Sequence, residues 1–206
     1  SIMKEEVNSY PTYFVTPSSY YCKYWTDVLL KNVIFIPHAL DIERLKCNKT
    51  TEQIMKKYQL DNNKIKILLP SRLEMIQKRP QKILKNIAEE NGINAKFVRF
   101  DHINEGYKVT DLVLVPSKSE SFGYSALESL YVGIFTILSN IPTLREIATG
   151  TTNYFFFENN KDLAMILKNN VDKLRNERKE ISKEWLKKYD LDLFARRYID
   201  VINDGN

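Results

Sequence analysis

The chain has 206 residues, which fits one large domain or one domain with an appendage, and two full domains are not expected. Hydrophobic residues make up 43% and charged residues 28%, a balance typical of globular proteins that excludes disorder as the main state. The net charge is only +5, but seven Lys or Arg lie between Lys64 and Lys85 with Glu74 as the sole acid. Such a local basic cluster favours a small anionic ligand over nucleic acid, which needs a broad basic face.

Seven segments rich in β-branched and aromatic residues are predicted as strands. Those between Ile65 and Leu138 are short and almost wholly apolar, as in strands buried on both faces of a parallel sheet. Helical segments separate most of them, so the sequence predicts an α/β fold. In chain order the predicted strands are Tyr13 to Thr16, Val33 to Pro37, Ile65 to Pro70, Ala95 to Phe100, Asp111 to Pro116, Ile134 to Leu138 and Asn153 to Phe157.

Two helices have clear end signals. The first is expected from Pro80 to Gly92, with an apolar stripe made by Ile83, Leu84, Ile87 and Ala88. The second is expected from Tyr124 to Val132, with Gly133 as its stop. After Phe157 the pattern is helical almost to the end of the chain.

Several kinds of site are excluded by composition. Six glycines, about 3% of the chain against roughly 7% in average proteins, form neither a GxGxxG motif nor a P-loop. Two cysteines and two histidines, His38 and His102, are too few for a disulfide framework or a Cys/His metal site. No apolar run approaches the ~18 residues of a membrane span. A soluble, cytoplasmic protein is therefore expected.

Polar residues follow the first and third core strands, where ligands bind in open parallel sheets. Arg72 and Lys78 come after the first and are suited to hold a phosphate pair; the alternative is that Lys78 and Arg79 are solvated surface charges. After the third strand, Glu120 precedes the predicted helix and Glu128, eight residues on, lies inside it. A helix would separate them by ~12 Å, too far to act on one water molecule, so they are expected to contact two parts of an extended ligand.

The helix start between these glutamates offers further ligand groups. A carboxylate suits a vicinal diol such as a ribose, and the amides of Phe122, Gly123, Tyr124 and Ser125 are placed to bind a phosphate. The alternative is a capped, solvent-exposed helix start in which the acids only complement the helix dipole.

This segment resembles the E-x7-E element of retaining GT-B glycosyltransferases of family 4. In that family Pro-Ser is followed by Glu, Gly-Phe-Gly, Glu-Ala and a Gly before a strand. The same order occurs in this chain. Three flanking segments also resemble elements of the family: the strand and Pro-His turn at Val33 to His38, the Ser-Arg-Leu segment at Ser71, and the Glu-Ile pair at Glu146. The matching segment reads PSKSESFGYSALESLYVGIFTI from residue 116.

The resemblance implies the C-terminal donor-binding domain of a GT-B enzyme, a Rossmann-like parallel sheet with helices on both faces. Residues 1–38 would be a remnant of the N-terminal domain and the interdomain crossover, 39–190 the donor-binding domain and 191–206 the C-terminal helix. It implies a nucleotide-diphosphate sugar as donor substrate, transfer with retention of configuration to a glycan or lipid-linked acceptor, and no metal or other cofactor.

The resemblance also implies roles for individual residues. Arg72 and Lys78 would bind the diphosphate, and Glu120 would contact the transferred sugar; these three form the expected catalytic set. Glu128 would bind the ribose, and the segment of Ser121, Phe122, Gly123, Tyr124 and Ser125 would complete the substrate site.

Three features depart from the family pattern. Ser71 and Arg79 stand where the family has glycine, and only residues 101–110 separate two strands where the family usually has a further strand and helix. Because the acceptor-binding N-terminal domain is missing from the match, the polypeptide alone is expected to bind donor weakly and to transfer sugar slowly or not at all. His102 is only a weak candidate for base recognition, and His38 is expected to be structural or a hinge contact.

Two other readings compete with the glycosyltransferase. One is a non-catalytic, Rossmann-like interaction scaffold that has lost nucleotide binding. The other is peripheral association with the inner face of a membrane, through the basic helix Pro80 to Asn91 or the segment around Trp185.

Overall fold

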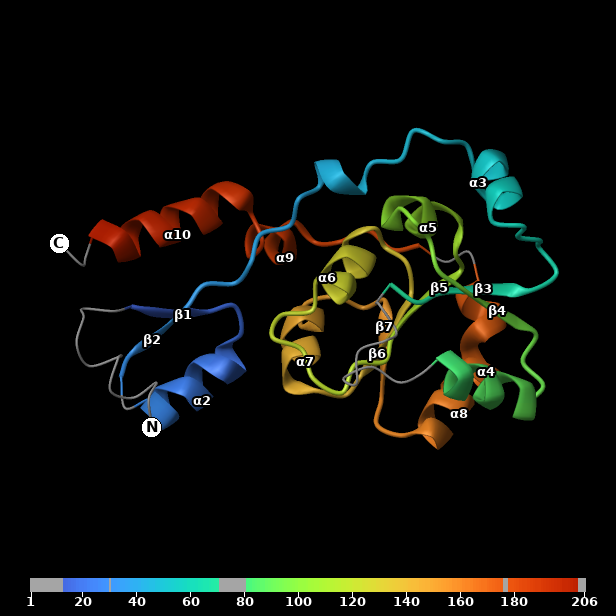
Figure 1. Cartoon of the computed structure of the whole chain (residues 1–206), viewed down its shortest axis with the longest axis horizontal. Coiled ribbons are helices and arrows are strands. Elements are labelled where there is room, and N and C mark those ends of the chain that lie inside the picture. The colour runs from blue at the N-terminus through green and yellow to red at the C-terminus, as the bar shows by residue number, and fades with distance from the viewer. Residues whose placement is uncertain (1–12, 30, 71–80, 176–177, 204–206) are drawn as a thin grey trace. The chain divides into compact units, whose positions relative to one another are not determined.

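The structure is a computed structural model that describes residues 13–29, 31–70, 81–175 and 178–203. The chain divides into two compact units, one made of Ser1–Leu40 with Lys183–Asn206 and the other of Asp41–Ser182. Figure 1 shows the helices and strands of both.

The Asp41–Ser182 unit is built on a parallel five-stranded sheet with the strand order β4-β3-β5-β6-β7. Every residue of β3, β5 and β6 is buried, which explains why these strands read as apolar runs. The predicted α/β fold and its parallel sheet are confirmed. The strands are β3 (Ile65–Leu68), β4 (Ala95–Val98), β5 (Leu112–Val115), β6 (Thr136–Ser139) and β7 (Tyr154–Phe157).

Helices cover both faces of this sheet (Figure 1). On one face, α4 (Gln81–Glu90) and α8 (Asn160–Leu174) close the main hydrophobic core, whose central residues are Ile67, Leu84, Leu112, Leu114, Ile137, Leu163 and Leu167. The other face carries α5 (Ile103–Val109), α6 (Tyr124–Tyr131) and α7 (Pro142–Ala148). A short 3-10 helix, η1 (Glu43–Leu45), and α3 (Thr51–Lys57) precede β3.

The predicted C-terminal ends of both helices are confirmed. Gly92 follows α4 with φ +68°, and Gly133 follows α6 with φ +76°, the left-handed conformation that glycine adopts most easily. Of the stripe predicted for α4, Leu84, Ile87 and Ala88 are buried, whereas Ile83 is 41% exposed. The predicted start at Pro80 lies outside the described residues.

The segment that follows α8 packs against Gly133. The amide of Lys179 donates to the carbonyl of Gly133 at 3.0 Å, and Ile134 forms an antiparallel bridge with Arg178. A Cβ on Gly133 would lie only 2.4 Å from the Lys179 carbonyl oxygen. This position therefore requires glycine for its backbone conformation and for the close approach of Lys179.

A buried ion pair links two neighbouring strands at their amino ends. Lys66 is 5% exposed and Asp111 is 8% exposed, and the Lys66 Nζ lies 3.0 Å from the Asp111 Oδ2. The same oxygen accepts the backbone amide of Lys66 at 2.7 Å. Each charge is thus compensated, as burial requires.

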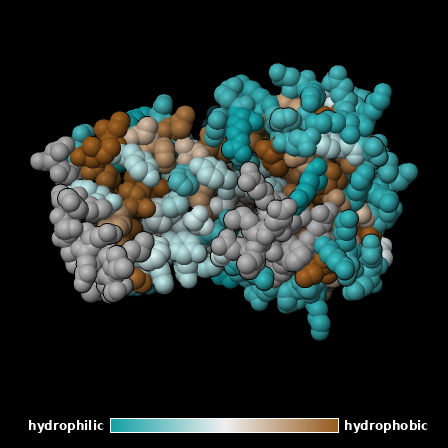
Figure 2. Space-filling view, in the orientation of Figure 1, coloured by the Kyte–Doolittle hydropathy of each residue, from teal (hydrophilic) through white to brown (hydrophobic). Residues whose placement is uncertain are grey.

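In the other unit, β1 (Phe14–Thr16) pairs in parallel with β2 (Val33–Phe35), with α2 (Ser19–Leu29) between them in the chain. The unit is completed by α9 (Lys183–Lys187) and α10 (Leu191–Asn203). The His38 ring lies 6.1 Å from that of Phe194, and burial lowers the pKa of His38. Leu191, Ile199 and Ile202 of α10 are exposed. Figure 2 shows hydrophobic surface in the region of this helix.

The two segments considered for membrane contact bury their main apolar groups. Trp185 is 1% exposed, so its indole is not available to insert into lipid, and the buried side of α4 faces the core. None of the described helices is both long and apolar enough to cross a bilayer.

Candidate functional site

The carboxyl ends of β3, β4 and β5 point to one edge of the sheet because all three strands are parallel. Polar and charged residues follow β4 and β5 at this edge, where α/β proteins bind their ligands. The predicted site residues Glu120 and Glu128 belong here, since the chain runs from β5 into α6.

Glu120 lies in the loop between β5 and α6 and is half-buried. Its Oε1 accepts a hydrogen bond from the Ser117 hydroxyl at 2.6 Å. Its main-chain carbonyl accepts one from the Thr143 hydroxyl at 2.8 Å. Both the side chain and the backbone of this glutamate are therefore held in place.

The loop reaches α6 through Gly123. This residue caps the helix with φ +100°, and a Cβ there would lie 2.8 Å from the Leu144 Cδ2. Phe122 is buried and its ring lies 5.1 Å from that of Tyr124, which is 44% exposed. Ser121 is exposed and Ser125 half-buried, so this segment presents its serines and Tyr124, rather than Phe122, at the surface.

Glu128 is a buried carboxylate with two different partners. It is 5% exposed, its Oε2 accepts a hydrogen bond from the Tyr107 hydroxyl at 3.0 Å, and its Oε1 lies 3.6 Å from the Arg44 Nη2. Burial raises the pKa of Glu128, while the Tyr107 hydrogen bond and the charge of Arg44 oppose this rise. Burial also raises the pKa of Tyr107 well above its ordinary value, so its hydroxyl stays protonated and donates.

A pocket of about 550 Å³ opens at the ends of β3 and β4, within the size range of small-molecule sites. Arg44 lines this pocket and also contacts Glu128, so it connects the two features. The pocket is lined by Arg44, Leu69, Pro70, Arg99, Phe100, Asp101, His102, Ile103 and Asn104.

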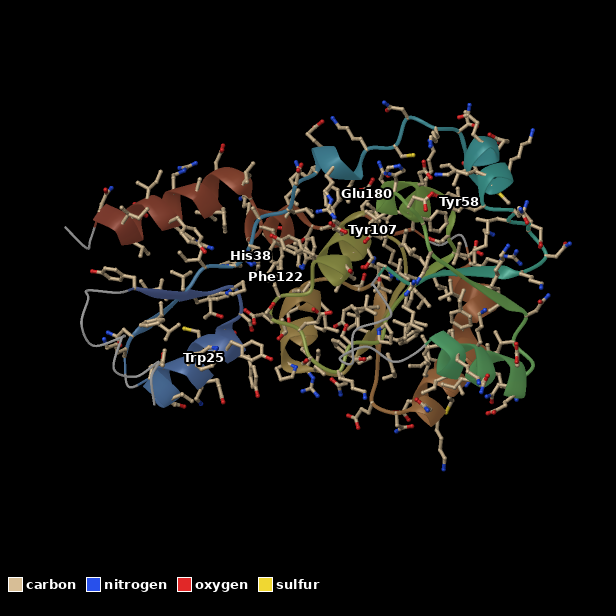
Figure 3. The ribbon with its side chains drawn as sticks, in the orientation of Figure 1. Trp25, His38, Tyr58, Tyr107, Phe122 and Glu180 are labelled. Carbon is tan, nitrogen blue, oxygen red and sulfur yellow. The ribbon has the colours of Figure 1, made fainter. Side chains whose placement is uncertain are left out.

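Helix α5, which carries Tyr107, is anchored by a second buried carboxylate. Glu105 is 3% exposed and bonds Lys49, the Lys57 Nζ at 3.1 Å and the Tyr58 hydroxyl at 2.8 Å. The hydrogen bond from Lys49 is the main cause that lowers the pKa of Glu105 to about 2; those from Tyr58 and Lys57 add to it, and burial opposes it. Figure 3 labels Tyr58 and Tyr107 among the side chains of this region.

The structure thus places Glu120 before α6 and Glu128 inside it, as predicted. Arg72 and Lys78 lie outside the described residues. The sequence interpretation missed Arg44, Arg99 and Tyr107 because no motif marks them, and it treated His102, which lines the pocket, only as a weak candidate. No group of three or more His, Cys, Asp or Glu that could hold a metal occurs in the described parts of the chain.

Solved glycosyltransferase structures share this fold. A glycosyltransferase from Rickettsia africae ESF-5 matches with a TM-score of 0.69 and 16% identity, over 100% of this chain and 67% of that chain. Sucrose-phosphate synthase from Thermosynechococcus elongatus matches with a TM-score of 0.66 and 14% identity, over 92% of this chain and 57% of the other.

WaaG, a glycosyltransferase involved in lipopolysaccharide biosynthesis, matches with a TM-score of 0.57 and 15% identity, over 90% of this chain and 58% of its own. The chain therefore spans 57% to 67% of the lengths of these three proteins. At these identities the matches establish the fold, that of a GT-B glycosyltransferase domain.

A search of curated protein sequences found no match. The family of glycosyl transferases group 1, in contrast, matches residues 77–188, which is more than half of the chain. That range contains β4 to β7, both site glutamates and the glycine stops of α4 and α6. The chain therefore belongs to the group 1 glycosyl transferase family.

Proposed function

We propose that this chain binds a nucleotide-diphosphate sugar as the donor domain of a retaining glycosyltransferase. The observation that carries this proposal is the buried Glu128, joined through Arg44 to a pocket of about 550 Å³ at the carboxyl-end edge of the sheet. A buried carboxylate suits the hydroxyls of a ribose, and the adjoining pocket has room for a base.

The remaining roles follow from the family resemblance. Glu120, held by Ser117 and Thr143, contacts the transferred sugar, and the segment from Ser121 to Ser125, which leads into α6, contributes amides. Arg72 and Lys78 bind the diphosphate and stabilise the charge that develops on it as it leaves. These cations take the place that a divalent metal has in other transferases, so we propose transfer without a metal and with retention of configuration.

The acceptor is proposed to be a glycan or a lipid-linked sugar. Because the solved relatives extend well beyond the region matched by this chain, we propose that acceptor binding needs an N-terminal domain in addition to these 206 residues. The assignment of residues 1–38, 39–190 and 191–206 to the crossover, the donor domain and a C-terminal helix stays a prediction, as does a cytoplasmic or membrane-peripheral location.

A direct test is a titration with UDP, GDP, ADP and their sugar conjugates in the absence of metal, followed by thermal shift and calorimetry. Ligand at about 100 times its Kd stabilises the folded state by ~2.7 kcal/mol, which corresponds to a rise in Tm of roughly 5–10 °C for a protein of this size. Glu128→Ala should lose this rise. Glu90→Ala, which removes an exposed carboxylate of α4, is the matched control and should keep it.

The non-catalytic scaffold predicts a different result. If no nucleotide or nucleotide sugar stabilises the wild type at millimolar concentration, donor binding is refuted. If one does, and Glu128→Ala responds as strongly as the wild type, the chain binds nucleotides but not through this carboxylate.

A further inference from the structure

The two oxygens of Glu128 have unequal surroundings. Oε2 faces the interior, where its partner is the Tyr107 hydroxyl on α5, and Tyr107 is only 2% exposed. Oε1 faces Arg44, whose side chain is 61% exposed and lines the pocket. The carboxylate therefore has one oxygen anchored inside the protein and one directed toward the pocket.

The anchoring side is held from several directions. The backbone carbonyl of Tyr107 accepts a hydrogen bond from the Arg178 Nη2 at 2.7 Å. Two residues earlier in the same helix, the buried carboxylate of Glu105 pairs with Lys49 and Lys57. Between Glu105 and Tyr107, Gly106 lets α5 pack so closely that a Cβ would lie 2.7 Å from the Phe100 Cδ2, just after β4, and 3.1 Å from the Leu68 Cδ1 of β3. The Tyr107 hydroxyl is therefore a fixed donor.

The pocket side is held weakly by comparison. Arg44 approaches Oε1 at 3.6 Å, longer than a hydrogen bond, from a solvent-exposed position on η1. An ion pair without a hydrogen bond is weaker than a hydrogen-bonded one. Ligand hydroxyls that donate to Oε1 can therefore replace or supplement this contact without loss of the internal one.

We propose that Tyr107 is a positioning residue for donor binding, which holds the Oε2 of Glu128 so that Oε1 faces the vicinal hydroxyls of the nucleotide ribose. This inference rests on the proposed function. It adds that the selectivity for ribose depends on the hydrogen bond between Tyr107 of α5 and Glu128 of α6, in which Tyr107 itself does not touch the ligand.

A carboxylate that loses its internal donor changes in two ways. It is free to rotate, so Oε1 no longer has a defined direction, and it is buried with one partner fewer, so its neutral form is favoured. The groups that face it are Tyr107 from α5 and Arg44 from η1. Both changes weaken the hydrogen bonds that the carboxylate accepts from the two ribose hydroxyls. The shift toward the neutral form has its largest effect at acidic pH.

The experiment compares a nucleoside diphosphate with its 2′,3′-dideoxy form by calorimetry from pH 5.5 to 8, using the nucleotide that binds the wild type. Hydrogen bonds to a charged group predict a ribose preference of about 10-fold or more for the wild type. Tyr107→Phe should reduce that preference to within about 3-fold, with the largest loss at pH 5.5. The control Tyr154→Phe, which removes a hydroxyl from β7, should keep the full preference.

A double variant separates positioning from a general loss of stability. In a Glu128→Ala background the ribose preference should already be absent, and adding Tyr107→Phe should leave the affinity for both ligands unchanged within about 2-fold. A further loss would show that Tyr107 acts on binding by another route and would overturn the proposal.

The remaining outcomes are also decisive. If the wild type prefers the ribose form and Tyr107→Phe keeps that preference, the positioning role is refuted but the proposed function stands. If the wild type binds neither ligand, both are refuted. If Tyr107→Phe does not fold, the wild type labelled with ¹³C at the tyrosine Cζ supplies the test. The Tyr107 signal should shift on addition of the ribose form and not of the dideoxy form, and equal shifts would contradict the proposal.

Discussion

Replacing Gly133 by alanine tests how closely the segment after α8 is packed against the end of α6. Gly133 has φ +76°, and its Cβ would lie 2.4 Å from the carbonyl oxygen of Lys179. That atom belongs to the backbone, so relief of the clash must move the Lys179 segment. The movement would break the hydrogen bond from the Lys179 amide to the Gly133 carbonyl.

Gly92 provides a matched control for this substitution. It also follows a helix and has a similar φ of +68°, but no atom lies within 4 Å of a Cβ placed there. Gly92→Ala should therefore cost only the left-handed backbone strain, roughly 1–2 kcal/mol. Gly133→Ala should cost the same strain plus the lost hydrogen bond of about 1 kcal/mol and the displaced contacts, for a total of about 3 kcal/mol.

Equilibrium urea denaturation of the wild type and both variants measures the difference. The m-value should be nearly equal in all three, so the midpoints report the change in stability. If Gly133→Ala is no more destabilised than Gly92→Ala, the close approach of Lys179 does not contribute to stability and the reasoning fails.

Three further predictions concern buried charges. Asp111→Asn should lower the free energy of unfolding by about 3–5 kcal/mol because Lys66 keeps an uncompensated charge; adding Lys66→Met should restore part of that loss in urea melts, and a loss that is simply additive would contradict it. Because the pKa of Glu105 is lowered in the folded state, to about 2, its contribution to stability is present above the unfolded pKa and lost as the pH falls toward 2. Glu105→Gln should therefore show a weaker decline of stability between pH 5 and pH 2.5 than the wild type, and parallel curves would refute this. For Glu128, whose folded pKa is raised, the sign is opposite: its contribution is complete below the unfolded pKa and falls as the pH rises through the folded pKa. The stability of Glu128→Gln relative to the wild type should thus improve from pH 4 to pH 7, and a change in the other direction would show that the carboxylate is better stabilised than its burial indicates.

Local patterns in the sequence were sufficient for much of the fold. The apolar runs of β3, β5 and β6 marked buried parallel strands, because a strand covered on both faces has no polar side. Gly92 and Gly133 marked helix ends, because few other residues adopt a positive φ without strain. The E-x7-E segment placed Glu120 before a helix and Glu128 within it, and both assignments depend only on neighbours in the chain.

Helix α5 could not be predicted from local patterns in the sequence. The ten residues from Asp101 to Thr110 looked only like a short connection, yet they contain the helix Ile103–Val109, whose Glu105 is buried among Lys49, Lys57 and Tyr58. Those partners lie 47 to 56 residues away in the chain. The energy that anchors this helix comes from pairing across space, and no local propensity encodes it.

By itself, the sequence determined the fold class, the strand and helix segments around the site, and the two glutamates that the family resemblance marks as ligand contacts. The tertiary structure alone decided the surroundings of Glu128: that it is buried, that Tyr107 from α5 donates to one oxygen and that Arg44 from η1 lies beside the other. Strand and helix patterns arise from interactions between residues close in sequence, whereas the charge state and orientation of a buried carboxylate depend on groups that only the folded chain brings together.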